Sequence, residues 1–202
     1  MQNFSEYKAF LKHPDWKIHT KSKDGSRKLY TRISSKPLFC VKSISVFRED
    51  PLVVSNSISD TTIKQKYDET FDYGTAIYPQ VALDCGLQHF YFKKVLVVSP
   101  RDMIVFSRHK VISNTEHYFL AKSFDNDELF PQTKGIVRAA SPISGWRIQI
   151  KEPGDPENGI KPLMKVTFFS EADFKISLFI SKSAGPKSGH MSNALANFLV
   201  KA

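Results

Sequence analysis

The chain has 202 residues, a length that fits one domain, with 41% hydrophobic and 24% charged residues, as in an ordinary soluble globular protein. Its 29 basic and 20 acidic side chains give a net charge of +9, which favours an anionic partner, either a membrane surface or nucleic acid. No RNP-like aromatic motif, zinc-finger spacing or basic-region helix accompanies the basic residues, so a nucleic-acid-binding module is not expected.

The first third of the chain predicts a mixture of helices and strands. In chain order these are a helix over 4–11, two strands within 16–34, a strand over 37–49, and helices over 50–59 and 61–68. Pro14 ends the first helix, and Asp24–Gly25 is the turn of a hairpin. Pro51 suits a first helical turn, because its fixed φ is already helical.

The residue pattern in the rest of the chain predicts strands up to residue 171 and then a terminal helix. Runs of strand length, bounded by turn residues, lie at 71–83, 87–98, 103–113, 115–124, 135–150 and 162–171. The terminal helix, 186–202, carries an apolar stripe that includes Met191 and Leu199. That stripe must be buried. An antiparallel sheet that grips this helix buries it most economically, which predicts an α+β fold of about nine strands.

Several common signatures are missing from the sequence. Cys40 and Cys85 suggest neither a disulfide scaffold nor a metal site, and we expect both to be reduced core residues. The six histidines are dispersed, and there is no H-E-x-x-H, G-x-S-x-G or P-loop motif, so we expect neither an enzyme nor a cofactor. No apolar run reaches the roughly 20 residues that span a bilayer, and no signal-peptide pattern opens the chain. We expect a cytoplasmic monomer.

Four short strings carry a resemblance to a known family, in the same order along the chain. Residues 63–68 (IKQKYD) resemble a helix ending in an aromatic–Asp pair, with Tyr67 in place of the usual Trp. Residues 98–103 (VSPRDM) resemble a loop with an Arg–Asp pair, 134–139 (KGIVRA) the start of a strand, and 194–199 (ALANFL) the end of a final helix. The chain is similar to the START (steroidogenic acute regulatory protein-related lipid transfer) domain family.

This resemblance implies a single helix-grip domain over residues 1–202, in which a curved antiparallel sheet forms a tunnel and the C-terminal helix is its lid. The tunnel would hold one membrane lipid, whose burial is favourable by about 25 cal/mol per Å² of apolar area. The candidates for lining it are Gln88, Met103, Val105, Ser107, Tyr118, Trp146, Phe168, Met191, Leu195 and Phe198. For the apolar members plain core packing is the alternative, and for Gln88 and Tyr118 a hydrogen-bonded core or surface position.

The head-group candidate is Arg108. Family members often place an Arg five residues past the Asp of the Arg–Asp pair, a position that Ser107 occupies here. Because a shift of one residue reverses the face of a strand, we expect Arg108 in solvent unless a bulge turns it inward. An inward Arg108 would lack the family's acidic partner, whose place falls near Gln88, and could bind a lipid phosphate in bidentate fashion.

Two segments are candidate gates for transient contact with anionic membranes. One contains Lys93, Lys94, Val97 and Val98, for which a buried strand end is the alternative, and the other contains Leu129 and Phe130 in an acidic loop. Between them, Arg101 and Asp102 are expected to form an ion pair. The predicted function is transfer of a lipid between membranes, with a phospholipid favoured by the positive charge. A sterol carrier and a lipid sensor without transfer activity are the alternatives.

Overall fold

A computed structural model describes residues 4–82, 85–94, 98–177, 180, 182 and 190–201. Its strands form one sheet in the order β1-β2-β3-β10-β9-β7-β6-β5-β4, with β8 paired to β6 beside this path. The strands are β1 (Lys17–Lys21), β2 (Arg27–Ile33), β3 (Phe39–Arg48), β4 (Phe71–Ala82), β5 (Cys85–Phe92), β6 (Arg101–Ser113), β7 (Glu116–Ser123), β8 (Val137–Arg138), β9 (Ala140–Glu152) and β10 (Leu163–Asp173). Only β8 among these runs parallel to its neighbour, so the predicted antiparallel α+β fold is confirmed.

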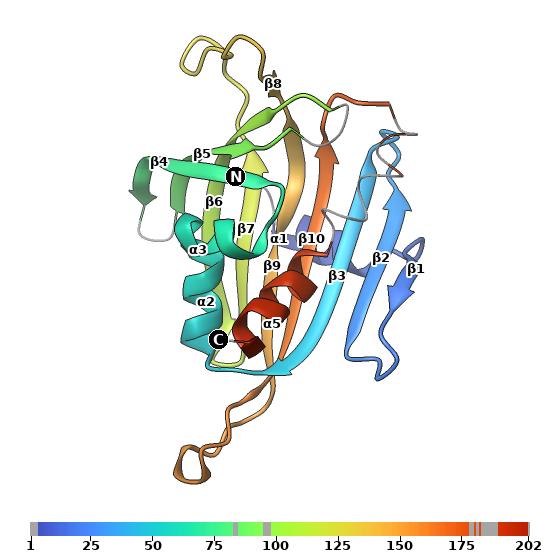
Figure 1. Cartoon of the computed structure of the whole chain (residues 1–202), viewed down its shortest axis with the longest axis vertical. Helices are drawn as coiled ribbons and strands as arrows, with labels where there is room; N and C mark the ends of the chain where they lie inside the picture. Colours follow the sequence, from blue (N-terminus) through green and yellow to red (C-terminus); the bar gives the residue numbers. More distant parts are fainter. Residues whose placement is uncertain are drawn as a thin grey trace.

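The α-helices divide between the two faces of this curved sheet, whereas a 3-10 helix lies in the connection from β9 to β10 (Figure 1). The helices are α1 (Phe4–Lys12), α2 (Pro51–Ser59), α3 (Thr61–Tyr67), the short 3-10 helix η1 (Pro156–Asn158) and α5 (Met191–Lys201). We call the face that carries α2, α3 and α5 the inner face, and the face that carries α1 the outer face. Trp146 packs with α5 on the inner face, whereas Phe169 packs with α1 on the outer face.

Three clusters of buried side chains hold these layers together. The lid-helix cluster joins α5, α2 and α3 to β9 and β10, and includes Leu195, Met164 and Trp146. The outer cluster joins α1 to the opposite side of the same strands. The third, which we call the β5–β6 cluster, is centred on Met103 and Val105. Since alternate residues of one strand point to opposite faces, a single strand such as β9 contributes to both faces.

Local sequence accounts for several element boundaries. The hairpin of β1 and β2 turns at Gly25, whose φ of +73° suits glycine, and the Asp24 carboxylate accepts hydrogen bonds from Ser22 and Ser26. Helix α2 begins at Pro51, where the preceding Asp50 carboxylate accepts a hydrogen bond from the Leu52 N–H at 2.7 Å. Both features were expected from the sequence.

Other boundaries differ from the prediction because strands extend into expected loops. The expected loops at 84–86 and 99–102 contain the starts of β5 and β6, since Cys85 pairs with Arg108 and Asp102 pairs with Arg138 of β8. The expected strand over 135–150 is divided at Ala139 into β8 and β9. The described part of the terminal helix begins at Met191. The expected residues 186–189 lie outside the described residues.

Gly145 lies at a point of close approach between β9 and β7. Its φ is +156°, and a Cβ at this position would lie 2.3 Å from the Phe119 carbonyl oxygen and 3.1 Å from the Phe169 ring. No L side chain fits there without movement of the backbone. Gly145 therefore allows Phe169, which has no exposed surface, to pack closely against the outer face of β9 and β7.

Candidate functional site

A row of small residues crosses the inner face from β5 to β10. In register, Gly86 pairs with Ser107, Ser107 with Ala121, Ala121 with Ser144, and Ser144 with Ser170. Paired residues point to the same face, and Ser144 lies two positions before the inward-pointing Trp146, so the whole row points inward. We call these five residues the small-residue row. It separates the lid-helix cluster from the β5–β6 cluster.

Large aromatic side chains border this row without being fully covered. Phe119 and Phe168 lie on the side of the lid-helix cluster and Phe90 on the side of the β5–β6 cluster, and all three are only half-buried. In contrast, Met164 and Val166, further along β10 beneath the helices, have no exposed surface. The inner face is therefore filled at its two clusters and remains accessible along the small-residue row, where Ser107, Ala121, Ser144 and Ser170 are also half-buried.

Two of the three hydroxyl groups of the row donate to backbone carbonyls of the sheet. Ser107 Oγ donates a hydrogen bond to the Gly86 carbonyl oxygen, and Ser144 Oγ donates one to the Ala121 carbonyl oxygen, both at 3.3 Å. A serine hydroxyl that donates to the backbone in this way leaves less unsatisfied polarity facing the inner side. The row is thus small in volume and moderate in polarity, and can contact apolar material.

Helix α5 is fixed over one side of the inner face by polar contacts along β3. Ser45 Oγ donates to Asn193 Oδ1 at 2.6 Å, and the backbone N–H of Ser192 donates to Ser43 Oγ at 3.2 Å. The apolar side of the helix buries Leu195 completely in the lid-helix cluster. The helix is therefore anchored at β3 and reaches toward β9, in the position of a lid.

The structure brings nine of the ten predicted cavity residues to the inner face. Met103 and Val105 are buried in the β5–β6 cluster, and Gln88 is paired with Val105. Ser107 belongs to the small-residue row, whereas the remaining members contact the lid-helix cluster, namely Trp146, Phe168, Met191, Leu195 and Phe198. Phe198 is half-buried, and its ring lies 6.2 Å from that of Tyr67.

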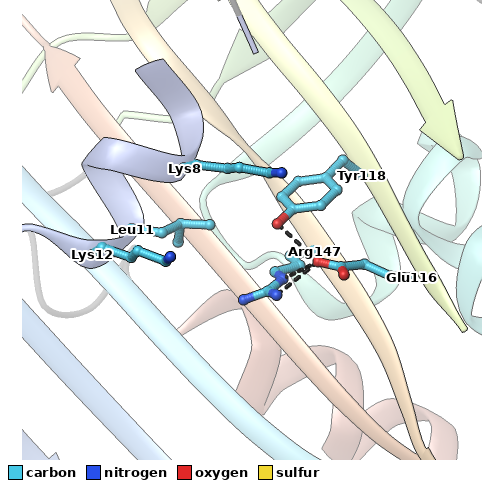
Figure 2. Close-up of a pocket in the computed structure, with 6 residues that line it drawn as sticks. All are labelled: Lys8, Leu11, Lys12, Glu116, Tyr118 and Arg147. Carbon is cyan, nitrogen blue, oxygen red and sulfur yellow. Dashed lines mark hydrogen bonds and ion pairs between the residues drawn. The ribbon is translucent and has the colours of Figure 1, made fainter. Parts of the chain in front are cut away.

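The prediction that Tyr118 lines the cavity is wrong, because this residue lies on the outer face. It pairs with Arg147, one position away from Trp146, and so points to the opposite side of the sheet. There it lines a small pocket of about 140 Å³ beside Lys8 and Lys12 of α1 (Figure 2). Its hydroxyl donates to Glu116 Oε1 at 3.0 Å, and burial raises the pKa of Tyr118 to about 12.

Arg108 also points to the outer face. It pairs with Cys85 on one side and with Leu120 on the other, and Leu120 belongs to the outer cluster beneath α1. No bulge interrupts β6 between Arg101 and Val111, so Ser107 points inward and Arg108 does not. A lipid phosphate on the inner face would therefore not meet Arg108, and its candidate role as a head-group ligand does not fit this placement.

The Arg–Asp pair of the sequence is not an ion pair. Arg101 Nε instead donates to the Phe174 carbonyl oxygen at 3.0 Å. Asp102 pairs with Arg138, whose Nε and Nη2 reach the two carboxylate oxygens at 2.9 and 3.0 Å, and His89 Nε2 lies 2.8 Å from the same carboxylate. Burial opposes ionisation of Asp102, but the hydrogen bonds of Arg138 and His89 outweigh it and hold the pKa of this carboxyl below its usual value.

The ion pair between Asp102 and Arg138 joins two of the four segments that carry the family resemblance. Asp102 belongs to residues 98–103 and Arg138 to residues 134–139. Both segments could be identified in the sequence, but the number of residues between them did not indicate that they lie in contact. The contact depends on β8 pairing in parallel with the start of β6. It fixes the end of the sheet at which the candidate gate segments lie.

Both candidate gates lie at this end, uppermost in Figure 1. The backbone N–H of Val137 donates to the Pro100 carbonyl oxygen, which ties the two connections together. Leu129 is 65% exposed, and Phe130 is half-buried with its ring 6.3 Å from that of Phe124. Lys93 and Lys94 are exposed and Val98 is half-buried, whereas Val97 lies outside the described residues.

Within the described ranges, no three His, Cys, Asp or Glu side chains are grouped so that they could hold a metal ion. None of the described helices is both long and apolar enough to cross a bilayer.

An antiparallel sheet that grips a C-terminal helix is a helix-grip fold, and solved structures share it. Human StAR-related lipid transfer protein 5 superposes with a TM-score of 0.80 at 15% identity, covering 96% of this chain and 90% of that chain. Human STARD10 gives 0.76 at 16% identity, covering 96% and 80%. A StAR-related lipid transfer protein fragment from Xanthomonas axonopodis gives 0.70 at 13% identity, covering 92% and 98%. At these identities the likeness establishes the fold.

The family follows from the sequence match. The model of the START domain matches residues 3–179, which is most of the chain. No curated protein sequence matches. The chain therefore belongs to the START domain family, whose members in general bind and transfer lipids or sterols.

Proposed function

We propose that this chain acts as one lipid-binding domain that holds a single lipid against the small-residue row and carries it between membranes. The observation that carries this proposal is the accessible inner face itself. Small side chains lie there between half-buried Phe90, Phe119 and Phe168, although the rest of that face is packed. Family membership supports the same reading, because START domains in general bind lipids.

The physical argument rests on surface that the fold leaves incompletely covered. An apolar chain laid against the three aromatic rings removes both its own surface and theirs from water, which is favourable by about 25 cal/mol per Å². Small side chains leave the volume that such a chain needs, whereas larger ones at the same positions would fill it. Binding, and not catalysis, is the activity that these side chains support, because the row offers no activated nucleophile or acid–base pair.

A phospholipid is the proposed ligand, with a sterol as the alternative. The net charge of +9 favours approach to anionic membrane surfaces. The exposed Lys93, Lys94 and Leu129, which lie at one end of the sheet, would make the contact. Arg108 does not contribute a phosphate ligand in the inner site, so the head group would be held by neutral groups such as Gln88 or by contacts near the gate.

Native mass spectrometry of the purified protein tests the binding step directly. We expect one added mass in the range of a phospholipid, lost on extraction with organic solvent. A sterol mass would support the alternative ligand. Vesicle assays then separate transfer from sensing, since a carrier both extracts labelled lipid from donor vesicles and delivers it to acceptors. Protein that binds no lipid, either as purified or after exposure to vesicles, would contradict the proposal.

A further inference from the structure

A second cleft lies on the outer face, on the opposite side of the sheet from the small-residue row. It has a volume of about 670 Å³, within the size range of small-molecule sites, and lies between α1, the turn from β2 to β3, and the neighbouring ends of β9 and β10. Its charged, histidine and hydroxyl side chains are Glu6, His13, Asp15, Arg32, Ser34, Ser35, Lys36 and Glu171. None of these residues belongs to the proposed lipid site.

Arg32 of this cleft stacks on two aromatic rings, and no described residue forms a hydrogen bond with its side chain. Its guanidinium lies over the rings of Phe10 and Trp16, at 4.6 and 5.1 Å from their centroids. Trp16 is itself fixed, because its Nε1 donates to the Phe10 carbonyl oxygen at 2.9 Å. Within the part of the chain that the structure describes, the buried Nε of Arg32 has no hydrogen-bond partner and the guanidinium has no ion pair.

An arginine in this state is unusual, because its N–H donors form a fork suited to anionic oxygens. Cation–π contacts orient the guanidinium but satisfy none of its N–H groups. A buried donor without an acceptor is costly, and such groups in native proteins call for an explanation such as a bound ligand. A phosphate or carboxylate entering the cleft would supply the missing acceptors.

Negative charge lies on the other side of the same cleft. Arg32 pairs with Cys40, and Cys40 with Glu171, so Arg32 and Glu171 are two strand spacings apart, or about 10 Å between Cα atoms. Both charges act on the Cys40 thiol between them. Among the described residues Glu171 forms no ion pair through its carboxylate. Asp15 lies against His13, whereas Glu6 stands exposed on α1.

We propose that this cleft binds a small zwitterion, with an anionic oxygen group at Arg32 and an ammonium group at Glu171. A simple anion would be repelled by the three carboxylates that line the cleft, and a simple cation by Arg32 and Lys36. A ligand that carries both charges can pair its anionic group with Arg32 and its cationic group with Glu171. Since Arg32 and Glu171 do not reach each other, the two charges of the ligand must be several ångströms apart, as in a phosphate and an ammonium separated by two carbons.

Isothermal titration calorimetry with O-phosphoethanolamine tests this site. We expect saturable binding, and binding of inorganic phosphate or ethanolamine alone that is at least tenfold weaker. Arg32→Gln and Glu171→Gln should each weaken binding at least tenfold. Arg27 lies on the same strand but donates a hydrogen bond to Asn197 of the lid helix, so Arg27→Gln should leave binding unchanged. Glu171→Gln keeps the test decisive if Arg32→Gln disturbs the stacking on Phe10 and Trp16.

A zwitterionic head group on a membrane offers the same chemistry as the free molecule, and vesicles distinguish the two sources. Flotation with phosphatidylcholine vesicles that contain phosphatidylethanolamine, weakened by Arg32→Gln and Glu171→Gln but not by Arg27→Gln, would assign the site to a head group. Calorimetric binding without flotation would assign it to a free ligand. Failure of both, or binding that neither substitution weakens, would overturn the proposal. The lipid-transfer assays do not depend on this outcome.

Discussion

Helices α1 and α5 pack on opposite faces of the same strands, but they leave different surfaces around them. Between α1 and the sheet, Tyr7 and Phe10 of the helix and Tyr118 and Phe169 of the strands are each at most 6% exposed. Around α5 the inner face is filled only at its clusters, and half-buried aromatic rings border a row of small residues. These aromatic side chains of the outer face are fully packed, and the outer cleft lies beside them. The inner face gives up part of that packing, which is what a ligand site requires.

The largest expected effect comes from two adjacent phenylalanines of β10. Phe169→Ala should lower the free energy of unfolding by about 4 kcal/mol, because it empties a fully buried aromatic position of the outer cluster. Phe168→Ala, on the inner face, should cost about half as much, since its ring is already partly exposed. Urea unfolding of both variants measures the difference. Equal losses would mean that the two faces are packed alike.

The buried ion pair beside the gates should give the next effect. Asp102→Asn should cost about 3 kcal/mol at pH 7, because it leaves the buried Arg138 with only the exposed Asp127, 3.6 Å from its Nη1, as a counter-charge. The pKa of Asp102 is lowered by folding, so its contribution is complete above about pH 4, the ordinary value for Asp, and is lost as the pH falls through the lowered value.

Urea unfolding of wild type and Asp102→Asn between pH 7 and pH 2 follows this loss. The wild type should become less stable relative to the variant as the solution is acidified. A stability difference that stayed constant down to pH 2 would show that Asp102 does not titrate in this way.

A methyl group at Gly145 should destabilise the protein less than these changes, but by a clearly measurable amount. Gly145→Ala should destabilise the protein by about 2–3 kcal/mol, because the new Cβ meets the Phe119 carbonyl oxygen. Gly135→Ala is the matched control. Its φ of +84° also disfavours alanine, but no atom lies within 4 Å of the added Cβ, so we expect about 1 kcal/mol. Thermal unfolding that ranked the two in reverse would contradict the packing described for β9.

Local patterns predicted the elements better than they predicted the site. Asp24–Gly25, Pro51 and the stripe of α5 could be identified because a turn, a cap and a helical period each depend on neighbouring residues. The period of a strand also separates its two faces, but does not say which face is inner. Tyr118 and Trp146 are equally apolar in sequence, and only the pairing of β7 with β9 places them on opposite sides.

Contacts between segments that are distant in the sequence could not be predicted from local patterns. The Asp102–Arg138 pair, the small-residue row and the stacking of Arg32 on Phe10 and Trp16 each depend on strand order or on where α1 docks. Three serines, an alanine and a glycine in separate strands carry no common motif. Their significance depends on register, which no single segment of the sequence specifies.

The most direct test of the account is to fill the small-residue row with one large side chain. Ala121→Phe places a ring on the inner face, and Lys122→Phe places the same ring on the exposed outer side of the same strand. If the row faces space for a lipid, Ala121→Phe should unfold within a few degrees of wild type and transfer labelled lipid between vesicles at least tenfold more slowly, while Lys122→Phe transfers at the wild-type rate. Folded Ala121→Phe protein that transfers lipid as fast as Lys122→Phe would contradict it.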